Sequence, residues 1–210
     1  METRTDLTAF AAKIGEVRKR IADVVVGQTE AVDMLLTCII ADGHVLLEGV
    51  PGVAKTLLAR LMSRLIDARF SRIQFTPDLM PSDILGTSVF NMKTQEFSFH
   101  PGPAFADIIL ADEINRAPAK TQAALFEVME ERQATIDGTS YKMGDVYTII
   151  ATQNPIEQEG TYRLPEAQLD RFLMKITMGY PSLDDEVEIL RRHNEHTSFA
   201  RLEDVEPIIT

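Results

Sequence analysis

Short runs of β-branched and other apolar residues alternate along the chain with longer stretches whose apolar positions recur at helical spacing. This alternation is typical of a parallel sheet flanked by helices. Residues 108–111 are apolar at every position, so we expect them inside the sheet and not at its edge. The predicted strands are residues 45–48, 70–75, 108–111, 146–152 and 173–177. The predicted helices are residues 7–24, 28–41, 55–66, 119–131 and 183–196.

Two β-hairpins are predicted to interrupt this alternation. The first joins residues 89–92 to residues 96–99, and the second joins residues 134–136 to residues 139–141. The turn of the second hairpin is Asp137-Gly138, a dipeptide that favours the type I′ turn because both of its positions tolerate positive φ. The pattern therefore predicts an α/β fold with a five-stranded parallel sheet and two hairpin insertions.

The composition is that of an ordinary globular protein: 45% of the 210 residues are hydrophobic and 25% are charged. No apolar stretch approaches the ~20 residues that a membrane-spanning helix needs. The first residues lack the basic start and apolar core of a signal peptide. Cys38 is the single cysteine and cannot form an internal disulfide, so we expect a cytoplasmic protein.

The charge balance bears on the class of partner. The chain has 32 acidic and 21 basic residues, a net charge of −11. Affinity for nucleic acid comes largely from Lys and Arg that neutralise phosphates. The longest basic cluster, Arg18–Arg20, is expected to form a solvated face of the first helix. Nucleic acid is therefore disfavoured as the main partner.

The most specific motif is residues 49–56, Gly-Val-Pro-Gly-Val-Ala-Lys-Thr, between a predicted strand and a predicted helix. A phosphate-binding loop requires that context, because its backbone N–H groups and the helix N-terminus point at polyphosphate oxygens. Ala54 stands where the usual pattern has its second glycine. Lys55 is expected to reach the β and γ phosphates, and Thr56 to bind Mg²⁺. The residues expected to bind nucleotide here are Gly49, Pro51, Gly52, Val53, Ala54, Lys55, Thr56 and Leu57.

A second motif follows the strand at residues 108–111, where Asp112 and Glu113 stand at its carboxyl end. Ligands of open α/β sheets bind at that end of the strands. Asp112 is expected to hold Mg²⁺ through its hydration shell, and Glu113 to polarise the water that attacks the γ phosphate. Together the two motifs predict Mg²⁺-dependent hydrolysis of ATP to ADP and phosphate.

Four stretches of sequence then narrow the class. They read GVPGVAKT, DEINRAPAKTQAALFEVMEERQ, ATQNP and LPEAQLDRF. In this combination the chain strongly resembles the AAA+ ATPases and, within them, the MoxR family, over about residues 24–181. The resemblance implies a sheet with its strands in the order 5-1-4-3-2 and a chaperone-like ATPase that remodels or activates a protein client.

The resemblance also implies roles for single residues. Asn154 would be the sensor 1 residue that contacts the γ phosphate or the attacking water, with a turn residue as the alternative. Arg171 would be an arginine finger that reaches the ATP of a neighbouring subunit in a ring, with a structural ion pair as the alternative. Arg116 could face the same interface. The three residues that would line the adenine pocket are Val25, Val26 and Gly27.

The partners implied by the resemblance are other copies of the chain, in a homo-oligomeric ring expected to be a hexamer, and a protein client. The client could carry a von Willebrand A domain, and both hairpins would face it or the central channel of the ring. The alternatives are a magnesium-chelatase-like or helicase-like motor subunit, a small-molecule kinase, and a nucleotide-gated scaffold with little turnover.

The family pattern divides the chain into three parts. These are an N-terminal helix (residues 1–24), an ATPase core (25–182), and a helix with a tail (183–210). Family members continue into a helical lid with a sensor 2 arginine. We expect residues 183–210 to be only the start of that lid, and turnover to be slow where the lid is missing.

Overall fold

A computed structural model describes residues 7–155, 162, 164–194, 202 and 205–209. The centre of the fold is a parallel sheet. Its five strands lie in the order β2-β5-β8-β1-β9, which confirms the order expected from the family resemblance. All neighbouring pairs are parallel, and β5 is an inner strand with every residue buried. The strands are β1 Val45–Gly49, β2 Phe70–Gln74, β5 Ile108–Asp112, β8 Thr148–Gln153 and β9 Met174–Met178.

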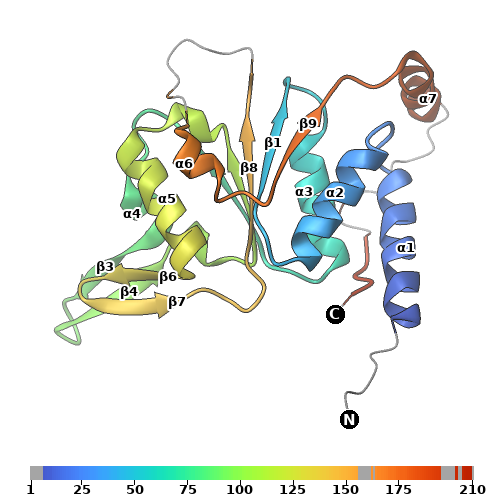
Figure 1. The fold of residues 1–210 in the computed structure, drawn as a ribbon. Helices are drawn as coiled ribbons and strands as arrows, with labels where there is room; N and C mark the ends of the chain where they lie inside the picture. Colours follow the sequence, from blue (N-terminus) through green and yellow to red (C-terminus); the bar gives the residue numbers. More distant parts are fainter. Residues whose placement is uncertain (1–6, 156–161, 163, 195–201, 203–204, 210) are drawn as a thin grey trace.

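Helices cover both faces of this sheet, with α1, α2 and α3 on one face and α5 and α6 on the other (Figure 1). The carboxyl ends of β1 and β8 both point up in this view, so the two strand ends lie side by side at the upper edge of the sheet. The helices are α1 Thr8–Ala22, α2 Thr29–Ile40, α3 Lys55–Leu65, α4 Pro81–Leu85, α5 Ala119–Glu131, α6 Glu166–Leu169 and α7 Leu183–Asn194.

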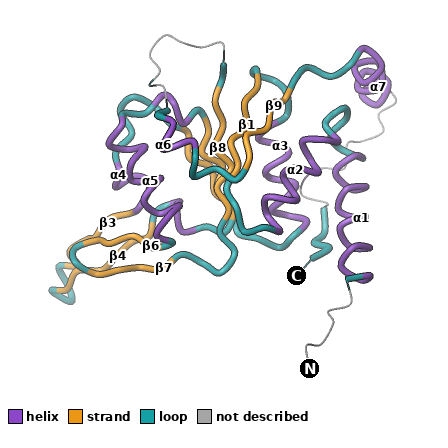
Figure 2. The backbone as a smooth tube through the Cα atoms, viewed as in Figure 1, coloured by secondary structure: helices purple, strands orange, loops and turns teal. Residues whose placement is uncertain are grey.

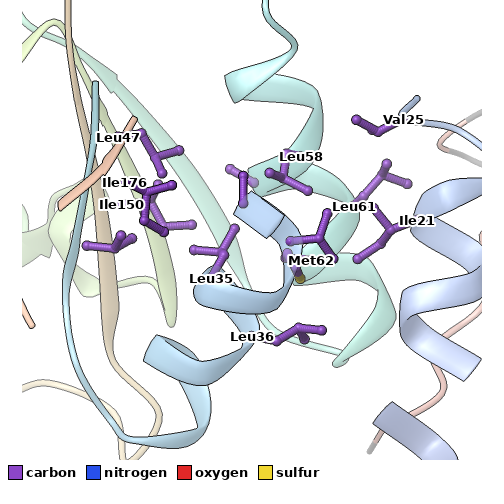
Figure 3. Close-up of a cluster of buried hydrophobic side chains, with 14 of the residues drawn as sticks. Ile21, Val25, Leu35, Leu36, Leu47, Leu58, Leu61, Met62, Ile150 and Ile176 are labelled. Carbon is purple, nitrogen blue, oxygen red and sulfur yellow. The ribbon is translucent and has the colours of Figure 1, made fainter. Parts of the chain in front are cut away.

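Alternate residues of each inner strand enter different hydrophobic clusters, one on each face of the sheet. On β1, Val45 and Leu47 pack with α1, α2 and α3, whereas Leu46 packs with α5. Figure 3 shows the first cluster, in which Leu35 of α2 and Leu58 of α3 lie between the sheet and α1. Burial of each such leucine stabilises the fold by roughly 1.5–3 kcal/mol, so the two clusters hold the strand ends in register.

The two predicted hairpins are confirmed, as β3 Gly86–Asn91 with β4 Glu96–Pro101 and as β6 Gln133–Ile136 with β7 Thr139–Lys142. They lie together beyond α5 (Figure 2). The ring of Phe99 stacks on that of Tyr141 with 4.1 Å between centroids, which joins one hairpin to the other. The turn residues Asp137 and Gly138 both have positive φ, as a type I′ turn requires.

The boundaries of several elements differ from the expected ones. The first helix ends at Ala22, and β8 begins at Thr148, where its N–H donates to the carbonyl of Asp107. Helix α7 is described to Asn194, and residues 195 and 196 of the predicted helix lie outside the described part. The short helices α4 and α6 were not predicted, because four or five residues are too few to display a helical period.

A buried histidine, His44, connects the strand layer to α5. Its Nδ1 accepts the N–H of Ile149 at 3.1 Å, and its Nε2 lies 3.2 Å from the carbonyl oxygen of Met129. This pair of contacts suits the neutral ring with its proton on Nε2, because protonated Nδ1 could not accept. Burial lowers the pKa of His44, with a smaller lowering by Arg132, against the raising effects of the Met129 carbonyl and Asp42.

The His44 contacts predict a stability that depends on pH. Because the folded pKa lies below the unfolded value near 6.5, the unfolded chain binds more protons, and stability falls as pH falls through that region. We expect the free energy of unfolding, from urea titrations between pH 7.5 and 5.5, to fall less steeply in His44→Gln than in the parent chain. His100→Gln, at an exposed histidine, serves as the control and should keep the parent slope. Equal slopes in all three proteins would contradict the assignment.

Candidate phosphate-binding site

A cavity at the carboxyl ends of β1, β5 and β8 brings the two sequence motifs together. It has a volume of about 390 Å³ and lies between the β1–α3 loop and the ends of β5 and β8. The residues that line it are Pro51, Gly52, Ala54, Lys55, Thr56, Leu57, Asp112, Glu113 and Asn154. Phosphate-binding, metal-binding and water-polarising candidates therefore face one space.

The loop that forms one wall of the cavity turns sharply into α3. Gly52 has φ of 90°, and Ala54, the residue that precedes α3, has φ of 62° in the left-handed region. A glycine would adopt the second conformation without strain, which explains why the usual pattern has glycine where this chain has Ala54. The first N–H groups of a helix have no acceptor within it, and the first residues of α3, Lys55–Leu57, line the cavity, so an anion bound there can accept them.

Lys55 lies at the first position of α3 and folds back over the loop. Its Nζ donates to the carbonyl oxygen of Gly49. Partial burial lowers the pKa of Lys55, while the negative charges of Asp112 and Glu113 act in the opposite direction. The cavity thus holds one ammonium group beside two carboxylates, a balance that the arrival of phosphate would change.

Asp112 is buried at the end of β5, and both of its carboxylate oxygens accept hydrogen bonds. Oδ1 accepts from the hydroxyl of Thr152 on β8 at 2.6 Å. Oδ2 accepts from Arg72 on β2, with Nη2 at 2.6 Å and Nε at 3.2 Å. Strands on both sides of β5 therefore fix this carboxylate.

Glu113 follows in an unusual backbone conformation, with φ of 56°. Its N–H donates to the Thr152 hydroxyl at 2.9 Å, so one buried hydroxyl serves both acidic residues. Its Oε2 accepts from Gln74 Nε2 at 2.8 Å and from Arg116 Nη1 at 2.9 Å. A non-glycine residue at such a φ costs of order 1–3 kcal/mol and is common at functional sites. Glu113 lines the cavity, and the Thr152 contact holds its backbone there.

A polar triad joins the adjacent strands β8, β1 and β9 beside the cavity. Glu48, the residue before Gly49, accepts from Gln153 Nε2 at 2.7 Å and pairs with Lys175 Nζ at 2.9 Å. Burial opposes ionisation of Glu48, but the hydrogen bonds from Lys175 and Gln153 outweigh it and the pKa of Glu48 is lowered. The triad fixes the start of the phosphate loop relative to Asn154, which follows Gln153.

The remaining predicted site residues lie elsewhere. Arg171 does not line the cavity; its Nη1 donates to the carbonyl oxygen of Phe126 at 3.0 Å and pairs with the carboxylate of Glu130. The side chain of Val25 is 6% exposed and belongs to the hydrophobic core. Val26 is half-buried, and Gly27 lines a second cavity of about 340 Å³ with Tyr180. In the loop itself, Val53 is buried in the core.

Sequence reasoning missed five residues that shape the site. Three of them contact Asp112 or Glu113 from neighbouring strands: Thr152, Arg72 and Gln74. The other two, Glu48 and Lys175, pair with each other across β1 and β9. The predicted order of strands could have drawn attention to Gln74 and Thr152, since both stand at carboxyl ends next to Asp112.

The donors present suit Mg²⁺ bound together with phosphate. In the described part of the chain no cluster of three or more His, Cys, Asp or Glu is arranged to hold a metal ion. Thr56 and Asp112 nevertheless offer hard oxygen ligands on one cavity. Mg²⁺ commonly binds through one or two protein oxygens, substrate phosphates and retained waters, so these residues fit it as a companion of the nucleotide.

Comparison with known proteins gives a consistent match. A family model described as "ATPase family associated with various cellular activities (AAA)" matches residues 44–174. Chaperone MoxR1 of Mycobacterium tuberculosis is 52% identical over 186 residues, which cover 87% of this chain and 49% of that protein. The protein YeaC of Bacillus subtilis is 50% identical over 196 residues, which cover 93% of this chain and 60% of YeaC.

A solved structure agrees with these sequence matches. The crystal structure of a protein assigned as an ATPase from Cytophaga hutchinsonii has a TM-score of 0.83 and 48% identity. The match covers 95% of this chain and 60% of that one. The chain thus spans about half to three-fifths of the length of these relatives. None of the helices in its described part is long and apolar enough to cross a bilayer.

The double role of the Thr152 hydroxyl predicts a large effect for a small change. Thr152→Val keeps the shape but leaves Asp112 Oδ1 and the Glu113 N–H without this partner, so the free energy of unfolding should fall by roughly 1–3 kcal/mol. Thr177→Val, at an exposed position of β9, should change it by no more than about 0.5 kcal/mol. Urea denaturation measures both. A loss in Thr152→Val no larger than the control's would show that the hydroxyl does not hold the two acidic residues.

Proposed function

The chain belongs to the MoxR family of AAA+ ATPases, and on that premise we propose that it hydrolyses Mg²⁺-bound ATP and uses the cycle to remodel a protein client. The observation that carries the proposal is the cavity itself. One space is lined by Lys55, Thr56, Asp112, Glu113 and Asn154, the residue types that phosphoryl transfer to water requires.

The proposed chemistry assigns one task to each of these groups. Lys55 binds the β and γ phosphates together with the N–H groups at the start of α3. Mg²⁺, when bound, neutralises the charge that develops on the phosphates, and Thr56 and Asp112 would hold it. Glu113 accepts a proton from the attacking water, and Asn154 orients that water or the γ phosphate.

Ring assembly supplies a further group in this proposal. Arg171 would act in trans on the nucleotide of a neighbouring subunit, with Arg116 as a second interface residue. Within its own subunit the side chain of Arg171 is 33% exposed and pairs with Glu130, which is 60% exposed. Opening the ion pair costs about 0–1 kcal/mol. Releasing the hydrogen bond to the Phe126 carbonyl costs roughly 0.5–1.5 kcal/mol more, so contact with a neighbour's nucleotide can offset both.

The hairpins are proposed as the contact with the client. Phe90, Met92 and Phe97 of the first hairpin are 48%, 85% and 73% exposed. Exposed apolar groups gathered on one projecting element are typical of a protein-binding surface. A ring of six subunits, a client with a von Willebrand A domain and a cytoplasmic location stay predictions. A magnesium-chelatase-like or helicase-like motor and a scaffold with little turnover are the alternatives.

Glu113 provides the direct test of hydrolysis. Glu113→Gln should keep affinity for a fluorescent ADP analogue within about threefold and lower the rate of phosphate release by 10²–10⁴, because the amide cannot accept the water proton. Lys55→Ala is the matched control and should lose affinity for the nucleotide itself. Full turnover in Glu113→Gln would contradict the assignment of the water-polarising group, and undiminished affinity in Lys55→Ala would contradict the phosphate site.

Variants of Arg171 and of its partner Glu130 distinguish a trans-acting role of the arginine from a structural one. If Arg171 acts on a neighbour, Arg171→Ala mixed with Glu113→Gln should recover part of the phosphate release that each lacks alone, since one mixed interface holds intact groups from both. Glu130→Ala breaks the same ion pair but keeps the arginine, and should retain turnover. No recovery in mixed assemblies verified by cross-linking, together with equal losses in Arg171→Ala and Glu130→Ala, would favour a structural ion pair.

A further inference from the structure

Arg72, on the strand next to β5, forms an ion pair with Asp112, the carboxylate proposed to bind Mg²⁺. Arg72 lies on β2, two residues before Gln74, which pairs in register with Asp112. Its guanidinium reaches along the sheet to Asp112 Oδ2 at 2.6 Å, and Nη2 also donates to Gln74 Oε1 at 3.0 Å. The Asp112 side chain is only 12% exposed, so its end of this contact is shielded from water.

The two carboxylates that line the cavity are each paired with an arginine of the same subunit. Asp112 pairs with Arg72, and Glu113 pairs with Arg116 at 2.9 Å. The second oxygen of Asp112 is engaged by Thr152, so a metal ion or a water of its hydration shell must share or replace an existing contact. Within the described part of the cavity wall, no third acidic residue adds negative charge.

We propose that Arg72 sets the affinity of the site for Mg²⁺, by competing with the cation for Asp112. The proposal rests on the nucleotide site described above. Mg²⁺ gives up its waters reluctantly and needs net negative charge around it, which the arginines largely cancel here. The cation therefore enters together with the phosphates of the nucleotide, and the protein alone binds it weakly.

The direction in which Mg²⁺ affinity changes when Arg72 is removed distinguishes competition with the cation from support of its ligand. If Arg72 only oriented Asp112 for the metal, its removal would weaken Mg²⁺ binding. If it competes, its removal strengthens Mg²⁺ binding, because the carboxylate regains its charge and a positive group leaves the vicinity of the cation. The two roles predict effects of opposite sign.

Arg69 offers a matched control in the same chain. It stands just before β2 and pairs with Asp107 at 2.6 Å, the same distance as the Arg72–Asp112 pair, but neither residue lines the phosphate cavity. Arg69→Gln therefore removes an equivalent surface arginine without touching the proposed metal ligand.

The test measures how strongly Mg²⁺ and nucleotide favour each other's binding. The dissociation constant of a fluorescent ADP analogue is determined with excess EDTA and across a Mg²⁺ titration, which together give the Mg²⁺ affinity of the protein–nucleotide complex. We expect Arg72→Gln to bind Mg²⁺ tenfold or more tightly than the parent chain. Arg72→Lys, which keeps the charge, should gain less, and Arg69→Gln should match the parent.

Unchanged or weaker Mg²⁺ binding in both Arg72 variants, with the EDTA affinity for the ADP analogue intact, would overturn the inference while leaving the proposed nucleotide site in place. If the parent chain itself did not bind the ADP analogue, that result would instead contradict the proposed function. Circular dichroism of each variant identifies any that do not fold, and the two Arg72 variants supply independent readings.

Discussion

The hydroxyl of Thr152 is the interaction on which the geometry of the site depends. It donates to the buried carboxylate of Asp112 and accepts the N–H of Glu113, so one group on β8 fixes two acidic residues at the end of β5. Both contacts require β5 and β8 to lie in parallel and in register, which the buried side chains on the two faces of the sheet ensure. Packing far from the cavity thereby determines where its charges lie.

The alternation of apolar runs and helical periods was sufficient to predict the architecture. Strands read from continuous apolar segments, such as residues 108–111, need no tertiary information because they are buried on both sides. The order of the strands came from the family resemblance and is confirmed. The cavity residues were predicted because local sequence dictates a loop between a strand and a helix, and because parallel strands end at one edge.

The contacts that surround the acidic residues could not be predicted from the sequence, because they join residues far apart in the chain. Arg72 and Asp112 are a surface arginine and an acidic residue until the register of β2 and β5 places them together. The ring of His44 bridges Ile149 and Met129, which both lie far from it in the sequence. Arg171 is expected to face a neighbouring subunit, but within its own subunit it pairs with Glu130 of α5. Its action on a neighbour stays a prediction.

The central claim is that this cavity hydrolyses ATP with help from a neighbouring copy of the chain. Its most direct test is the rate of phosphate release per subunit from Mg²⁺-bound ATP as the protein concentration rises. A rate per subunit that increases with concentration and then levels off is the predicted result, because each cavity then gains a group from a neighbour. A constant rate near zero over the whole range, in the presence of measurable ATP binding, would contradict the claim and favour a nucleotide-gated scaffold.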